Sequence, residues 1–253
     1  MRVTTRDKAI DYLQRKVEGF KAIRSPSVLL IRRAPRGTSA PKGRLGIFPA
    51  SFNPPTKAHV ALVREARKQY GLDEVLVLLD LQAMDKRIFG ASLAHRLFML
   101  SLLFRRDPRI SIGLSNRGLF VEKLRPLRKH YPASTAFFFM VGFDTMLRIM
   151  DKRYYRNRNH SLRQLFRKNC LLVANRGEQD EKAFQELFGR PEHRAFRSRV
   201  GFFRLPKVFY AHSSSLVRDR IQQRKSVSDC LPPIILHFIL NTGLYKSQLA
   251  ACE

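Results

Sequence analysis

Residues 46–59 read GIFPASFNPPTKAH, an apolar run that passes through a proline-rich loop into a segment of helical character. This order is typical of the junction between a β-strand and an α-helix, where open α/β sheets bind their ligands. A helix that begins near Thr56 would direct its free N–H groups and positive dipole end towards an anion, and Thr56 and His59 would share one face. The stretch therefore predicts a phosphate site. The alternative is an ordinary loop, with Thr56 as a helix cap and His59 as a hydrogen-bonded helix residue.

Apolar runs of the same kind recur along the chain and alternate with segments of helical pattern. They cover residues 45–48, 75–79, 110–114, 136–141, 171–174 and 200–205. The runs are nearly continuous in Val, Leu, Ile and Phe, as in parallel strands that are covered on both faces. We therefore predict a Rossmann-like α/β fold with a doubly wound parallel sheet. Residues 214–223 and 232–241 are expected to form C-terminal helices that close it.

A short N-terminal extension precedes this domain. Apolar residues at helical spacing predict an amphipathic helix over residues 6–22, and a short strand is expected at 28–31. Residues 34–43 are rich in Pro and Gly and nearly free of apolar side chains, which indicates a linker. We therefore divide the chain into an extension with its linker over 1–43 and a Rossmann-like domain over 44–253.

The net charge is the most unusual feature of the composition. The chain has 48 Lys and Arg residues against 20 Asp and Glu, a formal charge of +28 over 253 residues. Such a field concentrates polyanions, so nucleic acid is a candidate partner. The basic residues are spread along the chain instead of forming one tail, and a solvated basic surface is the alternative.

The cysteines and the hydropathy pattern exclude several classes of protein. Cys170, Cys230 and Cys252 are too few and too far apart for a disulfide framework or a paired zinc motif, so no metal ligands are predicted. No run reaches the roughly 18 apolar residues of a membrane span, and no signal peptide is recognised at the start. We expect a protein of a reducing compartment, by default the cytoplasm.

A second anion site is predicted near the C-terminus. Residues 212–218 read HSSSLVR and open a helix after the last predicted strand. Serine hydroxyls, helix N–H groups and the guanidinium of Arg218 could converge there on phosphate oxygens, which arginine grips in a forked geometry. Serines at a helix start are also common caps, which is the alternative. Two anion sites in one α/β domain suggest a polyphosphate ligand.

Taken together, four blocks resemble the nucleotidyltransferase superfamily, and within it the nicotinamide and nicotinate mononucleotide adenylyltransferases. The blocks are residues 51–59, 139–146, 213–218 and 231–245. Their order and spacing hold from about Gly46 to Tyr245. Weaker similarity to the bacterial nicotinate enzymes comes from Lys86, residues 95–100 and residues 176–177.

The resemblance implies transfer of AMP from ATP to a mononucleotide with release of pyrophosphate, and Mg²⁺ accompanies ATP, held largely by phosphates and waters. It assigns His59 and Thr56 to the α- and β-phosphates with Lys57 as a charge partner, and Arg218 to the β- and γ-phosphates. The further ATP contacts that it implies are Ser51, Phe52, Asn53, Gly142, Asp144, Ser213, Ser214 and Ser215. Asp144 has an alternative role as a helix cap.

The sequence departs from the family pattern around the acceptor. Ala50 stands where the family usually has glycine, the chain has no Trp, and residues 120–123 replace a segment that usually contains tyrosine and threonine. Lys86, Phe120 and Arg176 are the predicted contacts of the acceptor. Phe120 or Phe89 would offer a stacking face, and a core position is the alternative for both.

Other functions stay open on the sequence alone. The acceptor could be phosphopantetheine or the substrate of a cytidylyl transfer. A basic RNA-binding protein that retains the fold without turnover is the alternative from a different class. The partners expected are ATP, a mononucleotide, a possible polyanion and a possible second copy of the chain.

Overall fold

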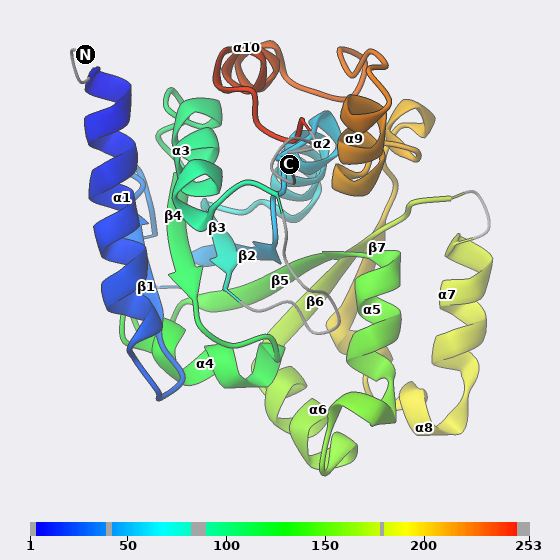
Figure 1. The fold of residues 1–253 in the computed structure, drawn as a ribbon. Helices are drawn as coiled ribbons and strands as arrows, with labels where there is room; N and C mark the ends of the chain where they lie inside the picture. The colour runs from blue at the N-terminus through cyan, green and yellow to red at the C-terminus, as the bar shows by residue number, and fades with distance from the viewer. Residues whose placement is uncertain (1–3, 39–41, 82–89, 178–179, 247–253) are drawn as a thin grey trace.

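The computed structural model describes residues 4–38, 42–81, 90–177 and 180–246 (Figure 1). Its centre is a seven-stranded sheet with the order β1-β4-β3-β2-β5-β6-β7. The strands are β1 (Val28–Arg32), β2 (Arg44–Ala50), β3 (Glu74–Asp80), β4 (Ile110–Ser115), β5 (Ala136–Gly142), β6 (Asn169–Ala174) and β7 (Val200–Phe203). Every predicted strand is present, and the last ends two residues earlier than expected.

The parallel part of the sheet is doubly wound, as predicted. Numbered along the chain, its six strands follow the order 3-2-1-4-5-6 of the Rossmann fold. Ile47 in β2 pairs with Leu76 of β3 on one side and with Phe139 of β5 on the other. The winding therefore reverses between β2 and β5, and ligands of such sheets bind outside the carboxyl ends of the strands at this point.

The strand of the N-terminal extension joins the same sheet, which the sequence did not predict. β1 runs antiparallel to β4, with Leu29 opposite Leu114. An antiparallel strand at the edge of a parallel sheet is common, and here it covers the edge that β4 would otherwise expose. The sheet is therefore mixed, whereas the prediction was a parallel sheet.

Helices cover both faces of the sheet (Figure 1). They are α1 (Thr5–Lys21), α2 (Lys57–Tyr70), α3 (Leu93–Leu103), α4 (Phe120–Arg128), α5 (Phe143–Met150), α6 (Arg158–Phe166), α7 (Asp180–Gly189), α8 (Pro191–Arg194), α9 (Ser214–Gln222) and α10 (Pro233–Thr242). Alternate residues of β3 enter different cores: Val77 packs with α1, α2 and α3, and Leu78 packs with α4 to α7. Within the described ranges, no helix has both the length and the apolar character needed to cross a bilayer.

The first helix is defined by its cap and its apolar stripe. The Thr4 side chain accepts a hydrogen bond from the Asp7 N–H, and the Asp7 carboxylate accepts one from the Thr4 N–H, which forms a capping box. Leu13, Val17 and Phe20 are buried in the core that α1 shares with α2 and α3. The amphipathic helix predicted over residues 6–22 is confirmed.

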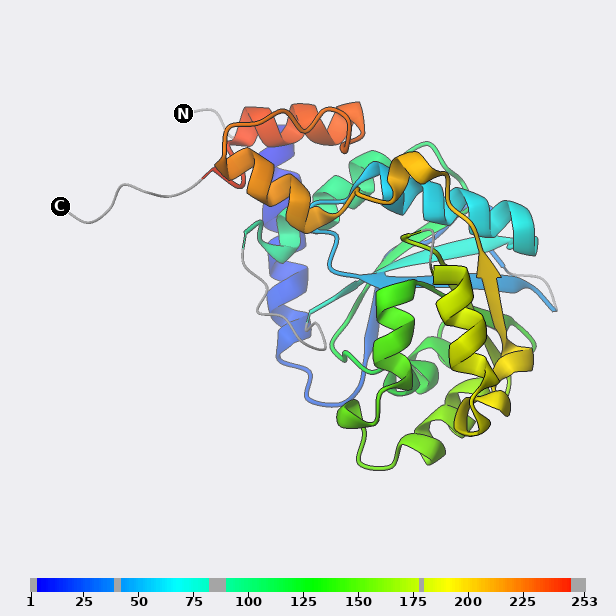
Figure 2. The same cartoon turned by 90° about the vertical axis from the view of Figure 1, so that its right-hand side faces the viewer.

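The two C-terminal helices pack beside each other, above the α3 side of the sheet (Figure 2). Val217 of α9, Ile235 of α10 and Met99 of α3 belong to one buried cluster. The segment between α9 and α10 reaches the start of α2, where the Lys57 N–H donates to the Cys230 carbonyl at 2.8 Å. This packing brings two distant parts of the sequence, residues 51–59 and 213–231, into contact.

Candidate active site

A pocket of about 120 Å³ opens where the winding of the sheet reverses. Its walls are the ends of β2, β5 and β6, the first turns of α2 and α5, and the segment before α9. The lining residues are Phe48, Pro49, Ala50, Ala58, His59, Leu62, Val141, Gly142, Asp144, Thr145, Ala174, Asn175, Arg176, Leu205, Phe209 and His212.

The hydrogen bonding of His59 fixes which of its nitrogens can serve a ligand. Thr56 is the N-cap of α2, and its backbone N–H donates to Nδ1 of His59 at 2.9 Å. The Thr56 Oγ1 lies 2.8 Å from the same nitrogen. A backbone N–H can only donate, so Nδ1 accepts and the neutral ring carries its proton on Nε2. The sequence left a helix cap and a pocket residue as alternatives. In the structure Thr56 is the cap of α2 and His59 also lines the pocket, so the two are compatible.

His59 is neutral at physiological pH. Its ring packs against Phe48 and Phe52, with ring centroids 5.8 Å and 5.2 Å away. Burial and, to a smaller extent, the nearby guanidinium of Arg176 together lower the pKa of His59 to about 3. The imidazole therefore offers a neutral N–H to the pocket, at the N-terminus of a helix whose dipole favours an anion.

The serine segment is bonded directly to the loop before α2. The Ser214 hydroxyl donates to the Pro54 carbonyl at 2.7 Å. Arg218 donates from Nη1 to the Asn53 carbonyl at 2.7 Å and from Nη2 to the Ser215 hydroxyl at 3.2 Å. The structure thus brings together the two segments that the sequence predicted as anion sites, and Arg218 braces the loop between them.

Two more contacts complete this brace. The Ser213 hydroxyl accepts from the Leu216 N–H at 3.0 Å and caps α9, as in the alternative reading of the serines. The Tyr245 hydroxyl donates to Oδ1 of Asn53 at 2.9 Å, and both residues are buried. Asn53 is therefore held through its backbone by α9 and through its side chain by the C-terminal segment.

The ends of β5 and β6 supply the polar groups of the facing wall. Gly142 ends β5 and is the N-cap of α5. A Cβ at Gly142 would lie 3.3 Å from Cδ of Arg176, so a larger residue would crowd the arginine. Asp144 is exposed in the first turn of α5 and is not its cap, so that alternative for Asp144 was wrong. Arg176 is anchored by its N–H, which donates to the Asp180 carboxylate.

Three predicted contacts have other surroundings in the structure. The Lys57 ammonium donates to the Ser228 carbonyl at 2.9 Å and does not line the pocket. The Phe52 ring is buried between Phe48 and His59, so only its backbone can serve a ligand. Phe120 is also buried, packed edge-to-face on a strand phenylalanine, and this supports a core position over a stacking face.

Among the other predicted contacts, Ser51 is partly buried in the loop after β2. Like Ser213, Ser214, Ser215 and Arg218, it is not in the pocket lining. Lys86 and Phe89 lie outside the described residues.

The family of the chain follows from a comparison with known families. The cytidylyltransferase-like family model matches residues 47–220, from β2 through α9. The chain belongs to the cytidylyltransferase-like family. It is accordingly a nucleotidyltransferase.

Relatives within the cytidylyltransferase-like group carry more specific names. A probable nicotinate-nucleotide adenylyltransferase of Carboxydothermus hydrogenoformans is 26% identical over 211 residues, which cover 80% of this chain and 98% of that protein. Its counterpart from Dehalococcoides mccartyi is 27% identical over 213 residues, with coverage of 81% and 98%.

A solved structure shows the same fold. The Plasmodium falciparum nicotinic acid mononucleotide adenylyltransferase complexed with NaAD aligns with a TM-score of 0.58 at 19% identity. The alignment covers 80% of this chain and 97% of that one.

Several pocket residues of this cytidylyltransferase-like chain were missed by sequence reasoning. Asn175 directly follows β6, and Gly142 is the last residue of the neighbouring strand β5. This position at the carboxyl end of a strand could have marked Asn175 as a pocket residue. Its side chain accepts from the Leu205 N–H at 2.6 Å and donates to the Tyr210 hydroxyl at 2.6 Å, which holds the rim. His212 directly precedes the serine segment. Thr145 lies in the 139–146 block that resembles the family, whereas Phe209 had no local signal.

Proposed function

We propose that the protein transfers AMP from ATP to nicotinate or nicotinamide mononucleotide and releases pyrophosphate. The observation that carries the proposal is His59, whose Nδ1 is bonded to the Thr56 N–H so that Nε2–H is left for a pocket ligand. The names of the relatives support the reaction. The Plasmodium falciparum enzyme, whose structures are described as complexes with NaAD and with APC, supports nucleotide ligands for this fold.

The proposed chemistry is a single in-line displacement. An oxygen of the mononucleotide 5′-phosphate attacks the α-phosphorus of ATP, a P–O bond forms, and the bond to the pyrophosphate oxygen breaks. No nucleophile from the protein is needed, so catalysis consists of positioning and of stabilising charge on the phosphate oxygens. The pocket suits this task because its lining offers an N–H donor, His59, and a cation, Arg176.

We assign the phosphates to the helix ends. His59 donates its Nε2–H to the α-phosphate, beside the N-terminus of α2. Ser214, Ser215 and Arg218 serve the β- and γ-phosphates, since the start of α9 is bonded to the loop that leads into α2. Because Arg218 also holds the Asn53 carbonyl, its loss would displace the loop as well as remove a charge.

The opposite wall is assigned to the nucleosides and the acceptor phosphate. Gly142 and Asp144 would contact the ribose or base of ATP, with the exposed Asp144 carboxylate accepting hydrogen bonds. Arg176 lies close enough to His59 to lower its pKa, so it would place a positive charge near the attacking phosphate. Lys86 remains a predicted acceptor contact.

Magnesium would bind together with ATP. Mg²⁺ is usually held by phosphates, waters and one or two carboxylates, and Asp144 supplies a carboxylate in the pocket lining. The ion would neutralise charge on the leaving pyrophosphate. Nothing else in the assignment of residues depends on it.

The acceptor is tested by a substrate series. Purified protein with Mg-ATP is given nicotinate mononucleotide, nicotinamide mononucleotide, phosphopantetheine or, with CTP, a phosphorylated alcohol, and products are separated by chromatography. We expect a dinucleotide from one or both pyridine mononucleotides. If ATP binds and neither reacts, the acceptor assignment is wrong, and the other products identify the replacement.

We further propose that a basic groove binds a polyanion such as RNA, in addition to catalysis. The groove lies between α2 and the start of β4, at the amino ends of β3 and β4 and so away from the pocket. Its cations are Arg64, Arg67, Lys68, Arg106 and Arg109, against the acids Asp73 and Asp107. Arg67 and Asp107 form an ion pair at 2.5 Å, and the remaining charge agrees in sign with the net +28.

RNA binding is tested by titration of a labelled single strand at several salt concentrations. Replacing Lys68, Arg106 and Arg109 by Glu should weaken binding and reduce the salt slope by about 2, since each contact contributes roughly 0.7. The control carries Glu at Lys8, Arg15 and Arg199, exposed residues elsewhere, with the same change in net charge. Equal losses in both variants would place binding on the whole basic surface.

The cytoplasmic location and a homo-oligomeric state stay predictions.

A further inference from the structure

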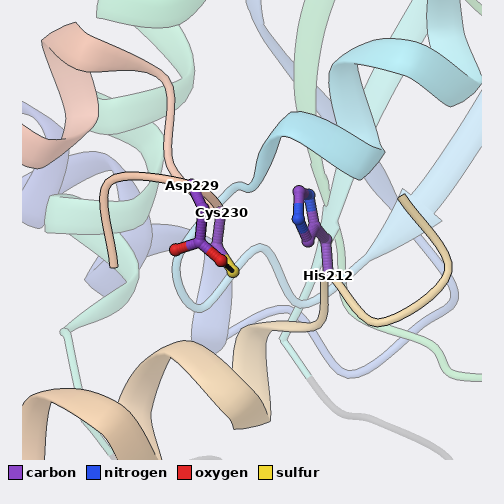
Figure 3. A group of neighbouring side chains, drawn as sticks. All are labelled: His212, Asp229 and Cys230. Atoms are coloured by element: carbon purple, nitrogen blue, oxygen red, sulfur yellow. Dashed lines mark hydrogen bonds between the residues drawn. The ribbon is translucent and has the colours of Figure 1, made fainter. Parts of the chain in front are cut away.

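Three side chains of metal-binding type, from the two segments on either side of α9, lie close to one another (Figure 3). His212 precedes α9, and Asp229 and Cys230 precede α10. One imidazole nitrogen, one carboxylate oxygen and the Sγ of Cys230 all lie within 4.8 Å of one another. His212 also lines the pocket assigned to the nucleotide.

A buried nitrogen of His212 gives an independent reason to expect a ligand here. The residue His212 is 7% exposed, and its Nδ1 is buried with no hydrogen-bond partner among the described residues. Buried polar atoms are nearly always satisfied, and an exception calls for a water, an ion or a functional role. Burial also lowers the pKa of His212, and the neutral imidazole is the form that binds metals.

The geometry points to a site for one divalent transition-metal ion of the zinc class, bound by His212, Asp229 and Cys230 with water as the fourth ligand. Zinc takes nitrogen, sulfur and oxygen donors in tetrahedral sites, whereas a thiolate disfavours Mg²⁺ and Ca²⁺. Donor atoms in a tetrahedral zinc site lie about 3.5 Å apart. The three donors lie within 4.8 Å of one another, so each pair would have to close by at most about 1.3 Å on coordination.

The neighbouring contacts are compatible with coordination. Nη1 of Arg220 donates to both oxygens of Asp229, at 2.9 and 2.7 Å, and lies 3.7 Å from the Cys230 Sγ. Each carboxylate oxygen keeps a further lone pair, so Arg220 orients the ligand as outer-shell partners commonly do. The Cys230 thiol donates to Asp229 at 3.5 Å, and on binding its proton passes to solvent as sulfur bonds the metal.

The charges of the site also balance. Lys57 at the start of α2 and Arg220 on α9 are the cations that face His212 and Cys230. The Cys230 thiolate and the Asp229 carboxylate together cancel the charge of a divalent ion. The metal site with its ligands is therefore neutral and does not repel Lys57 or Arg220. The same ion would tie the segment before α9 to the segment before α10. This would hold Ser214, Ser215 and Arg218 in place, a consequence that rests on the proposed function, whereas the site itself does not.

Cobalt is the probe for this site, because a thiolate bound to Co²⁺ gives a charge-transfer band in the near ultraviolet. Metal-free protein titrated with Co²⁺ should develop this band with one equivalent, and Zn²⁺ should abolish it. Cys230→Ser should remove the band. His212→Asn and Asp229→Asn should weaken binding by at least roughly tenfold. Zn²⁺ should raise the Tm of the wild type and leave that of Cys230→Ser unchanged.

Controls separate this site from other thiols and histidines. A Cys170→Ser/Cys252→Ser double variant keeps Cys230 as the sole thiol and should retain the band, as should His237→Asn at an exposed histidine. Asp229 is exposed, so Asp229→Asn tests the site without disturbing the core. A band that survives Cys230→Ser, or no Co²⁺ or Zn²⁺ binding at micromolar concentrations, would overturn the proposal. No nucleotide is present, so the outcome is independent of adenylyl transfer.

Discussion

His59 and His212 line the same pocket, and burial lowers the pKa of both, yet their surroundings differ in one respect. Nδ1 of His59 accepts from the Thr56 N–H, whereas Nδ1 of His212 has no partner among the described residues. The bonded histidine has a fixed tautomer, so its role towards a phosphate can be inferred from the protein alone. His212 has an unsatisfied nitrogen, and its ring lies close to a thiol and a carboxylate, so the role that we propose for it requires a bound ion.

The largest expected effect separates the two nitrogens of His59. His59→Asn keeps an acceptor near Nδ1 for the Thr56 N–H but loses the donor to the pocket, so kcat should fall by roughly 10²–10³. His59→Gln keeps a donor that can reach the pocket and should lose less activity. It gives up the acceptor of the cap, so it should lose more stability, about 1 kcal/mol.

Steady-state kinetics and urea unfolding of both His59 variants check this prediction. The order of the two variants should reverse between activity and stability. The same order in both measurements would contradict the assignment of one nitrogen to the cap and the other to the ligand.

Arg218 tests whether the brace between the two segments matters beyond its charge. Arg218→Lys keeps the charge but cannot hold both the Asn53 carbonyl and the Ser215 hydroxyl. Loss of charge-assisted bonds of this kind costs about 1.5–3 kcal/mol, so kcat/KM for ATP should fall by about 10- to 150-fold. Arg199→Lys, at an exposed site, is the matched control. A loss of less than about threefold for Arg218→Lys would show that only the charge is used.

Acid should destabilise the protein through His59. The folded pKa is about 3, below the usual 6.5, so between these values the unfolded chain binds a proton that the folded one does not. The stability that the neutral His59 contributes to the folded state is therefore complete above pH 6.5, and it is lost as the pH falls from 6.5 towards 3. Between pH 7.5 and pH 5, the wild type should lose about 1–2 kcal/mol more than His59→Asn in urea unfolding. Equal losses would mean that the ring is accessible to protons in the folded state.

The smallest expected effect concerns Ala50. Ala50 lines the pocket at a position where the mononucleotide adenylyltransferases that the sequence resembles usually have glycine. Its methyl group limits how closely a phosphate approaches the backbone. Ala50→Gly should lower KM for ATP by less than about tenfold, equivalent to less than about 1.4 kcal/mol. An unchanged or higher KM would show that the methyl group does not restrict ATP.

Much of the fold was predictable because the central strands are buried on both faces. Residues 75–79 and 136–141 are continuous apolar runs, and such runs mark strands without knowledge of their partners. The place of β1 was not predictable, since its antiparallel pairing with β4 joins residues about 85 apart in sequence. The local sequence pattern predicts which residues form a strand, whereas the neighbour of an edge strand depends on contacts between residues far apart in the sequence.

The site divides in the same way. His59 and Thr56 lie in one helix turn, so their spacing predicted their contact. The partner of Lys57 could not be predicted, because the Ser228 carbonyl comes from a segment that only tertiary packing brings near. Cys230 drew no attention as a metal ligand because the three cysteines are few and far from one another along the chain, and its closeness to His212 arises only in the fold.

The central claim is that this pocket transfers AMP by means of His59, and ³¹P NMR of one reaction tests it most directly. Protein, Mg-ATP and nicotinate mononucleotide should give a dinucleotide and pyrophosphate in equal amounts, and His59→Asn should give neither at a comparable rate. Release of ADP and phosphate, or undiminished dinucleotide formation by His59→Asn, would contradict the account.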